Sequence, residues 1–113
     1  MKATFVETAP FARIRADYLT DDDYRELQEA LLNEPRIGDT IAGTGGLRKV
    51  RWVLSGSSKG KRGGIRVIYY WWSETGRFLM FTLYAKGEVV DLSSDEKKQF
   101  KNMLQSLLAE IGD

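Results

Sequence analysis

The chain has 113 residues, of which 42% are hydrophobic and 12% aromatic, so it is large and apolar enough for one folded core. It contains no cysteine and no histidine, which excludes a disulfide framework, a thiolate metal site and the commonest general base. No apolar run approaches the roughly 20 residues of a membrane span, and the first residues are too polar for a secretory signal. We therefore expect a cytoplasmic protein with a single domain over residues 1–113 and with no metal or cofactor.

The net charge of +1 conceals a segregation of charge along the chain. Acidic residues outnumber basic ones in residues 1–34, basic residues dominate residues 36–77, and the remainder is again slightly acidic. A basic middle between acidic ends favours a binding site for a polyanion on one face of the fold.

The N-terminal third predicts a short strand followed by a helical hairpin. Residues 3–7 read as the strand, and the helix that follows starts around Pro10, because proline is favoured in a first turn. Thr20 is the expected N-cap of the second helix, which ends near Pro35. Three aspartates follow Thr20, and the helix dipole favours anions there, so capping explains this acidic cluster better than a metal site does.

The rest of the chain predicts a small sheet and a closing helix. Residues 36–46 form a glycine-bearing connection without the pattern of a nucleotide-binding loop. Residues 47–54, 65–72 and 78–85 then read as three neighbouring antiparallel strands, with a Gly-, Ser- and Lys-rich loop at 55–64. Ser93 and Glu96 form a capping-box pattern before a helix that ends at Gly112. The element order is β-α-α-β-β-β-α, an α+β fold.

Cations are spaced along the strands in a way that needs a reason, because an unpaired buried charge is costly. Alternation places Lys49 and Arg51 on one strand face, with Arg48, Val50 and Trp52 on the other. The set expected to converge on one face is Lys49, Arg51, Arg66 and Lys86, joined by Lys59, Lys61 and Arg62 of the loop. Such a face suits phosphate binding and RNA cleavage; the plainer alternative is a solvated sheet face with snorkelling side chains.

Two apolar features are open to two interpretations. Tyr70, Trp72 or Tyr84 can stack an unpaired base, although core filling is the simpler role for each aromatic side chain. The last helix carries an apolar stripe from Phe100 to Ile111 that packs on the core or is covered in part by a partner chain.

Three strings, in their order and spacing, resemble the RelE/ParE superfamily of bacterial toxins and, within it, the HigB-like branch of type II toxin–antitoxin systems. They are GTGGLRK at residues 43–49, KRGGIRVIYY at residues 61–70 and LYAKGE at residues 83–88. The resemblance spans nearly the whole chain. It implies a RelE-like fold, with a small, mainly antiparallel sheet packed against an N-terminal helical hairpin and a C-terminal helix.

The resemblance also implies a function. Relatives of the RelE kind enter the ribosomal A site and cleave mRNA there without a metal, and a cognate antitoxin, usually with a helix-turn-helix domain, neutralises them. The site residues carried over by the resemblance are Lys49, Arg51, Arg66 and a basic group near Lys86. We add Tyr84 as a positioning group, and Lys59, Lys61, Arg62 and Arg48 as contacts to ribosomal RNA.

Two other functions stay open at this level. ParE-type relatives share the fold but inhibit DNA gyrase, and fold alone does not separate these activities. A non-catalytic RNA- or ribosome-binding module is the other alternative. The general base is also open: without histidine, Lys49 and Lys86 are the candidates, since neighbouring cations lower the pKa of a lysine.

Overall fold

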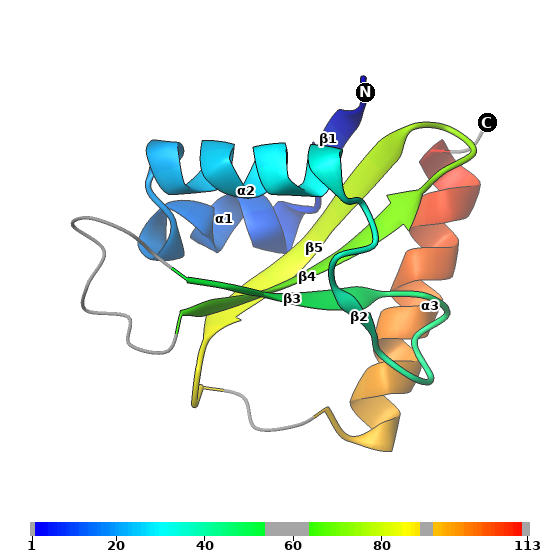
Figure 1. Ribbon diagram of the computed structural model, residues 1–113. Coiled ribbons are helices and arrows are strands. Elements are labelled where there is room, and N and C mark those ends of the chain that lie inside the picture. Colours follow the sequence, from blue (N-terminus) through cyan, green and yellow to red (C-terminus); the bar gives the residue numbers. More distant parts are fainter. Residues whose placement is uncertain (1, 54–63, 89–91, 112–113) are drawn as a thin grey trace.

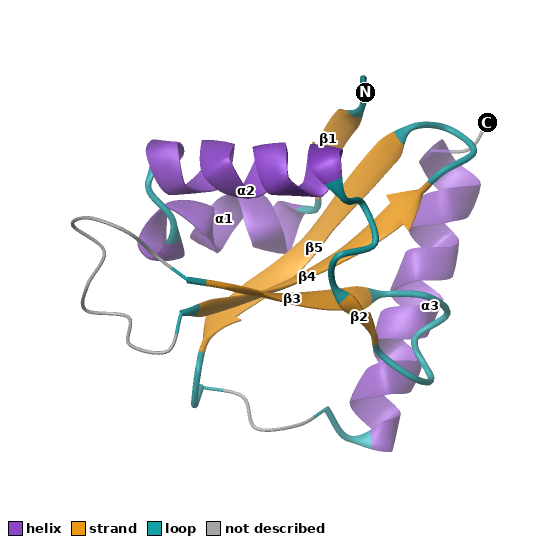
Figure 2. Ribbon diagram, viewed as in Figure 1, coloured by secondary structure: helices purple, strands orange, loops and turns teal. Residues whose placement is uncertain are grey.

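The computed structural model describes residues 2–53, 64–88 and 92–111 and has a mixed α+β architecture (Figures 1 and 2). The elements are β1 (Thr4–Glu7), α1 (Ala9–Tyr18), α2 (Asp21–Asn33), β2 (Asp39–Thr40), β3 (Arg48–Trp52), β4 (Ile65–Trp72), β5 (Arg77–Ala85) and α3 (Ser94–Ile111). The predicted order is confirmed, with one addition: the 36–46 connection contains the short strand β2. Most of the 55–64 loop lies outside the described residues.

The five strands form one sheet in the order β1-β5-β4-β3-β2. The pairs β5–β4, β4–β3 and β3–β2 are antiparallel, whereas β1 runs parallel to β5 at the opposite edge. A parallel pair needs a crossover connection, and here the helices α1 and α2 with the following strands supply it. The sheet is therefore mainly antiparallel, as the sequence predicts.

Helices cover both faces of the sheet (Figure 1). The α1–α2 hairpin packs on one face, over a core that includes Phe11, Leu27 and Tyr69. Helix α3 packs on the other face, over a smaller cluster that includes Ile68 and Leu104. Side chains of β4 alternate between these two clusters, which explains why its sequence is almost continuously apolar.

A β-bulge lies in the central β4–β5 ladder. The register steps from Ile68 opposite Thr82 to Tyr69 opposite Met80, so Phe81 is the extra residue. Phe81 is buried in the α3 cluster, while Met80 is buried under the helical hairpin. The extra residue shifts the alternation of side chains along β5. On either side of the bulge, the strand therefore places apolar side chains in both the hairpin cluster and the α3 cluster.

The predicted helix starts are confirmed by their hydrogen bonds. Thr8 caps α1, its Oγ1 accepting from the N–H of Phe11 at 3.2 Å. Thr20 and Asp23 form a reciprocal capping box at α2, and the N–H of Glu96 donates to the Ser93 hydroxyl at 3.1 Å ahead of α3. Capping, not metal binding, explains the aspartates of α2.

The predicted apolar stripe of α3 is only partly covered. Leu104 is buried, and Phe100, Leu107, Leu108 and Ile111 are partly buried against the sheet. Met103 is 44% exposed, because its side chain lies at the margin of the stripe. None of the helices in the described part of the chain combines the length and the apolar character needed to cross a membrane.

Tyr69 ties the α2–β2 connection to the sheet. Its hydroxyl donates to the Pro35 carbonyl at 2.7 Å and accepts from the N–H of Gly38 at 3.0 Å. Burial raises the pKa of the Tyr69 hydroxyl above its ordinary value. Gly38 is required at this point, because a Cβ there would come within 2.9 Å of the Tyr69 ring. This contact sets the position of β2.

We expect Tyr69→Phe to lower the free energy of unfolding by about 1–3 kcal/mol, because the buried Gly38 N–H loses its acceptor. Urea denaturation measures this change. Tyr70→Phe is the matched control, since Tyr70 is the next residue of β4 and no hydrogen bond of its hydroxyl is seen in the described structure. Equal stability of the two variants would contradict the role given to Tyr69.

Candidate functional site

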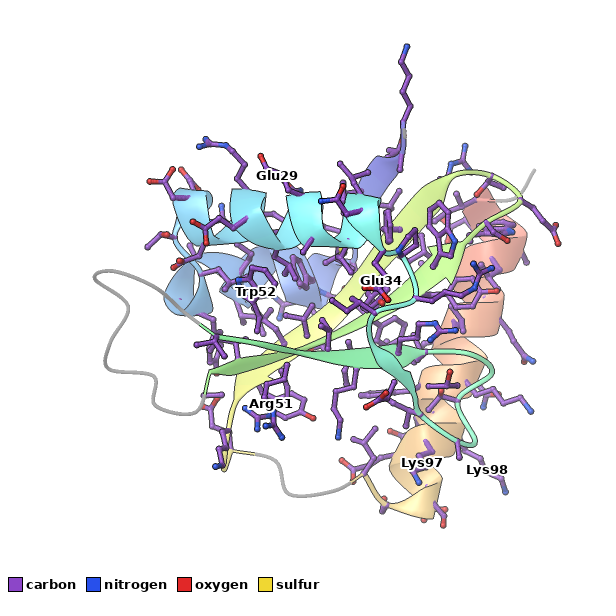
Figure 3. All side chains as sticks on the ribbon, in the orientation of Figure 1. Glu29, Glu34, Arg51, Trp52, Lys97 and Lys98 are labelled. Carbon is purple, nitrogen blue, oxygen red and sulfur yellow. The ribbon has the colours of Figure 1, made fainter. Side chains whose placement is uncertain are left out.

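Three polar side chains lie in one row across the face of the sheet that α3 covers. Arg51 of β3 is directly opposite Arg66 of β4, and Arg66 is directly opposite Tyr84 of β5. Cross-strand partners of this kind project from the same face, with Cβ atoms about 4.5–5.5 Å apart. Arg51 is exposed and Arg66 and Tyr84 are half-buried, so α3 leaves this end of the sheet open. In Figure 3, Arg51 and Trp52 point to opposite sides of β3.

A hollow of about 370 Å³ opens over this row, and we call it the cationic hollow. Its walls are Asp39, Lys49, Arg51, Arg66, Tyr84, Lys86 and Gly87. All five residues predicted as catalytic, Lys49, Arg51, Arg66, Tyr84 and Lys86, therefore lie around one space. They come from three strands and the turn after β5. The alternation predicted for β3 is therefore observed, and these five side chains line one hollow. The loop residues expected to join them lie outside the described part of the chain.

The turn that carries Lys86 is anchored on both sides. The N–H of Lys86 donates to the Gly64 carbonyl at 3.4 Å, at the start of β4. Gly64 has a φ of +80°, and a Cβ at this position would collide with the Trp52 carbonyl, so only glycine fits. The Glu88 carboxylate accepts from the N–H of Ala85 and, at 3.0 Å, from the Tyr18 hydroxyl of α1. These contacts hold the turn at the mouth of the hollow.

Among the described residues that line it, the hollow carries more cations than anions. Its four cationic side chains, Lys49, Arg51, Arg66 and Lys86, face a single carboxylate among the described residues of its wall, Asp39. Two guanidinium groups directly opposite each other on one sheet face repel each other. An anion placed between them relieves this repulsion, and the planar fork of arginine matches the oxygens of a phosphate. The arrangement is suited to a phosphodiester.

Asp39 is the site residue that sequence reasoning missed. It lies in β2, directly opposite Lys49 of β3, and therefore projects from the same face as Lys49. The sequence presents it within a glycine-bearing connection that reads as a turn, and only the β2–β3 register brings it to the hollow. Within residues 2–53, 64–88 and 92–111, no group of three acidic side chains could hold a metal ion.

The predicted RNA-contacting residues are placed differently. Arg48 projects from the other face of β3, where its guanidinium donates to the Gly38 carbonyl at 2.7 Å and to the Arg36 carbonyl at 3.4 Å. It supports the same connection as Tyr69 and does not line the hollow. Lys59, Lys61 and Arg62 lie outside the described residues, so their role stays a prediction.

The aromatic residues divide between the two layers as alternation predicts. Tyr69 and Trp71 pack with the helical hairpin, and Tyr70 packs in the α3 cluster. Of the three aromatic side chains considered for base stacking, Tyr84 lines the hollow, and Tyr70 and Trp72 do not. Tyr84 is thus the candidate to contact a base or ribose.

Comparison with known proteins supports the fold assignment. No protein-family model matches the chain. A solved structure of the E. coli toxin RelE, a mutant with two arginines replaced by alanine and in the free state, matches with a TM-score of 0.55 at 17% sequence identity. The match covers 92% of this chain and 98% of that one. The chain therefore has a RelE-like fold, as predicted, while its place in the HigB-like branch stays a prediction.

The facing arginines generate a testable stability effect. We expect Arg51→Gln to raise the free energy of unfolding by about a few tenths of a kcal/mol at low ionic strength, because it removes a like charge opposite Arg66. The gain should shrink in 300 mM NaCl, where exposed charges are screened. Urea denaturation at two salt concentrations measures both effects. Arg13→Gln, on the exposed side of α1, is the control. A clear loss of stability in Arg51→Gln would contradict repulsion at the site.

Proposed function

We propose that the chain is the toxin of a type II toxin–antitoxin module and acts as a ribosome-dependent mRNA endonuclease. The observation that carries this proposal is the row of Arg51, Arg66 and Tyr84 inside the cationic hollow. The RelE-like fold supports it. On this proposal the partners of the chain are the ribosomal A site, the mRNA and a cognate antitoxin with a helix-turn-helix domain.

The proposed reaction is an internal transesterification that needs no metal. The 2′-oxygen of a ribose attacks the adjacent phosphorus and loses its proton to a base. The bond from phosphorus to the 5′-oxygen breaks, and that oxygen takes up a proton. The products are a 2′,3′-cyclic phosphate and a new 5′-hydroxyl end. Negative charge grows on the phosphoryl oxygens during this step, and this is the charge that a preorganised cationic site stabilises.

Each residue of the hollow has a role in this reaction. Arg66, in the middle of the row, stabilises the charge on the phosphorane, and Arg51 beside it binds the same phosphate. Lys86, at the mouth of the hollow, protonates the leaving oxygen. Tyr84 contacts the base or ribose and so aligns the nucleophile. Lys49 is placed between Asp39 and the arginines and is the proposed proton acceptor.

We expect Arg66→Ala to reduce mRNA cleavage by about 10²–10³-fold, the usual cost of removing one donor to a developing oxyanion. Cell-free translation with purified protein, followed by mapping of mRNA 5′ ends with and without ribosomes, measures it. Arg13→Ala, on the other side of the sheet, is the matched control and should cleave like the wild type.

Two outcomes would contradict this assignment. Full activity of Arg66→Ala would remove the hollow from the reaction. Intact mRNA in reactions with wild-type protein would remove the endonuclease itself. A DNA-damage response without loss of mRNA would then favour a ParE-like inhibitor of gyrase.

Two substitutions identify the proton acceptor. With Lys49 in that role, we expect Lys49→Met to abolish cleavage, because the 2′-oxygen loses its base. Asp39→Asn keeps a hydrogen-bond acceptor at its position and should retain most of the activity. Single-turnover cleavage of an RNA bound in a stalled ribosome measures both variants. Cleavage lost in Asp39→Asn and kept in Lys49→Met would transfer the role of base to the Asp39 carboxylate.

A further inference from the structure

A second hollow of about 340 Å³ adjoins the cationic hollow. The two spaces share three wall residues, Asp39, Lys49 and Tyr84, so they lie side by side between the open end of the sheet and the start of α3. The proposed reaction at Arg66 uses only the first of them. An RNA strand continues beyond the phosphate that is cleaved, and the second hollow lies where a neighbouring part of the strand can go.

The far wall of the second hollow is built differently from the first. It consists of Thr40 at the end of β2, Ile41 directly after it, Leu92 before α3, and Lys97 in the first turn of α3. Two apolar side chains with the shared Tyr84 suit a nucleobase, and one cation beyond them suits one phosphate. This is the composition expected for a single nucleotide, in contrast to the four cations around the first hollow.

Lys97 is set apart from the other lysines of α3. Its side chain is half-buried, because its stem lies against the turn before β3. A Cβ built on Gly43 in that turn would lie 3.6 Å from Lys97 Cδ, an ordinary van der Waals contact. The adjacent Lys98 is exposed and lines neither hollow. Both lysines are labelled in Figure 3, at the end of α3 nearest to β2. A lysine stem packed in this way directs the ammonium group at lower entropic cost than a free one.

Asp39 lines both hollows and lies opposite Lys49 in the β2–β3 ladder, and Lys49 also lines both. Beside this carboxylate, a neutral ribose or base is favoured over a second phosphate. The carboxylate can accept a hydrogen bond from a ribose hydroxyl or from the amino group of a base at this point. A strand with one phosphate at Arg51 and Arg66, a ribose or base at Asp39, and the next phosphate at Lys97 satisfies all of these groups at once.

We propose that the second hollow binds the nucleotide next to the cleaved bond, with Lys97 holding its phosphate and Ile41, Leu92 and Tyr84 enclosing its base. This inference rests on the proposed action on RNA and extends it from one phosphate to two. It makes Lys97 a binding residue for a strand of at least two phosphodiester bonds.

The test compares two RNA probes that cannot be cleaved because every 2′-oxygen carries a methyl group. A dinucleotide has one phosphodiester bond and a trinucleotide has two. Calorimetric or NMR titration with full-length protein gives the Kd of each probe. In the wild type we expect the trinucleotide to bind tighter than the dinucleotide. Lys97→Ala and Lys97→Gln should weaken trinucleotide binding by about tenfold, leave dinucleotide binding unchanged and lower the salt dependence by about one phosphate contact.

Lys98→Ala is the matched control, since it removes the same charge one residue away from an exposed position. It should bind both probes like the wild type. Equal effects of Lys97→Ala and Lys98→Ala would overturn the inference, because they would reflect the general charge of the helix. No gain from the third nucleotide in the wild type, or no binding of either probe, would overturn it as well.

The Lys97 binding test and the Arg66 cleavage test can fail independently of each other. If Arg66→Ala abolishes cleavage in translation but Lys97→Ala leaves trinucleotide binding intact, the endonuclease stands and the second subsite falls. If the Lys97-dependent binding is found in a protein that leaves translated mRNA intact, the subsite stands and the chain is a non-catalytic RNA-binding module.

Discussion

The alternation of side chains along β4 is the constraint on which the rest of the structure depends. Ile65, Val67 and Tyr69 face the helical hairpin, and Ile68 and Tyr70 face α3. A central strand with apolar side chains on both faces needs a layer over each face, because exposed apolar surface on either side would be costly. Arg66 interrupts this pattern at the start of the strand. Where it stands, α3 leaves the sheet open, and the hollow forms.

Placing the cations on one face solves a problem that each of them poses alone. A guanidinium in the middle of a sheet is expensive to bury, yet a site that stabilises a phosphate must hold its charges in fixed positions before the ligand arrives. Strands β3 and β4 provide rigid positions for Arg51 and Arg66, and both side chains line the hollow at the open end of the sheet. The lysine after β5 has a less regular support, the turn held by Gly64 and Glu88.

The connection between α2 and β3 has a larger role than its composition indicates. Tyr69 and Arg48, both from the face opposite the hollow, fix the backbone of Gly38 by hydrogen bonds from two directions. That backbone leads directly into β2, and β2 presents Asp39 to both hollows. Residues on the face covered by the helical hairpin thereby position a carboxylate on the opposite face, at the hollow. The sequence predicts Arg48 to contact RNA. In the structure its guanidinium donates to backbone carbonyls of this connection.

Patterns within single elements could be predicted from the sequence. Helical spacing, the capping residues Thr20 and Ser93 and the two-residue period of β3 and β4 are local properties, and the structure confirms the elements they predict. The phase of Lys49 and Arg51 follows from the same period. Register and layer packing depend on residues far apart in the chain. The pairing of β2 with β3 brought Asp39 to the site, and the packing of α3 separated Lys97 from Lys98. Neither feature has a local signal in the sequence. Whether two residues pair as a strand, and which lysine of a helix lines a hollow, depends on the parts of the fold that these residues contact.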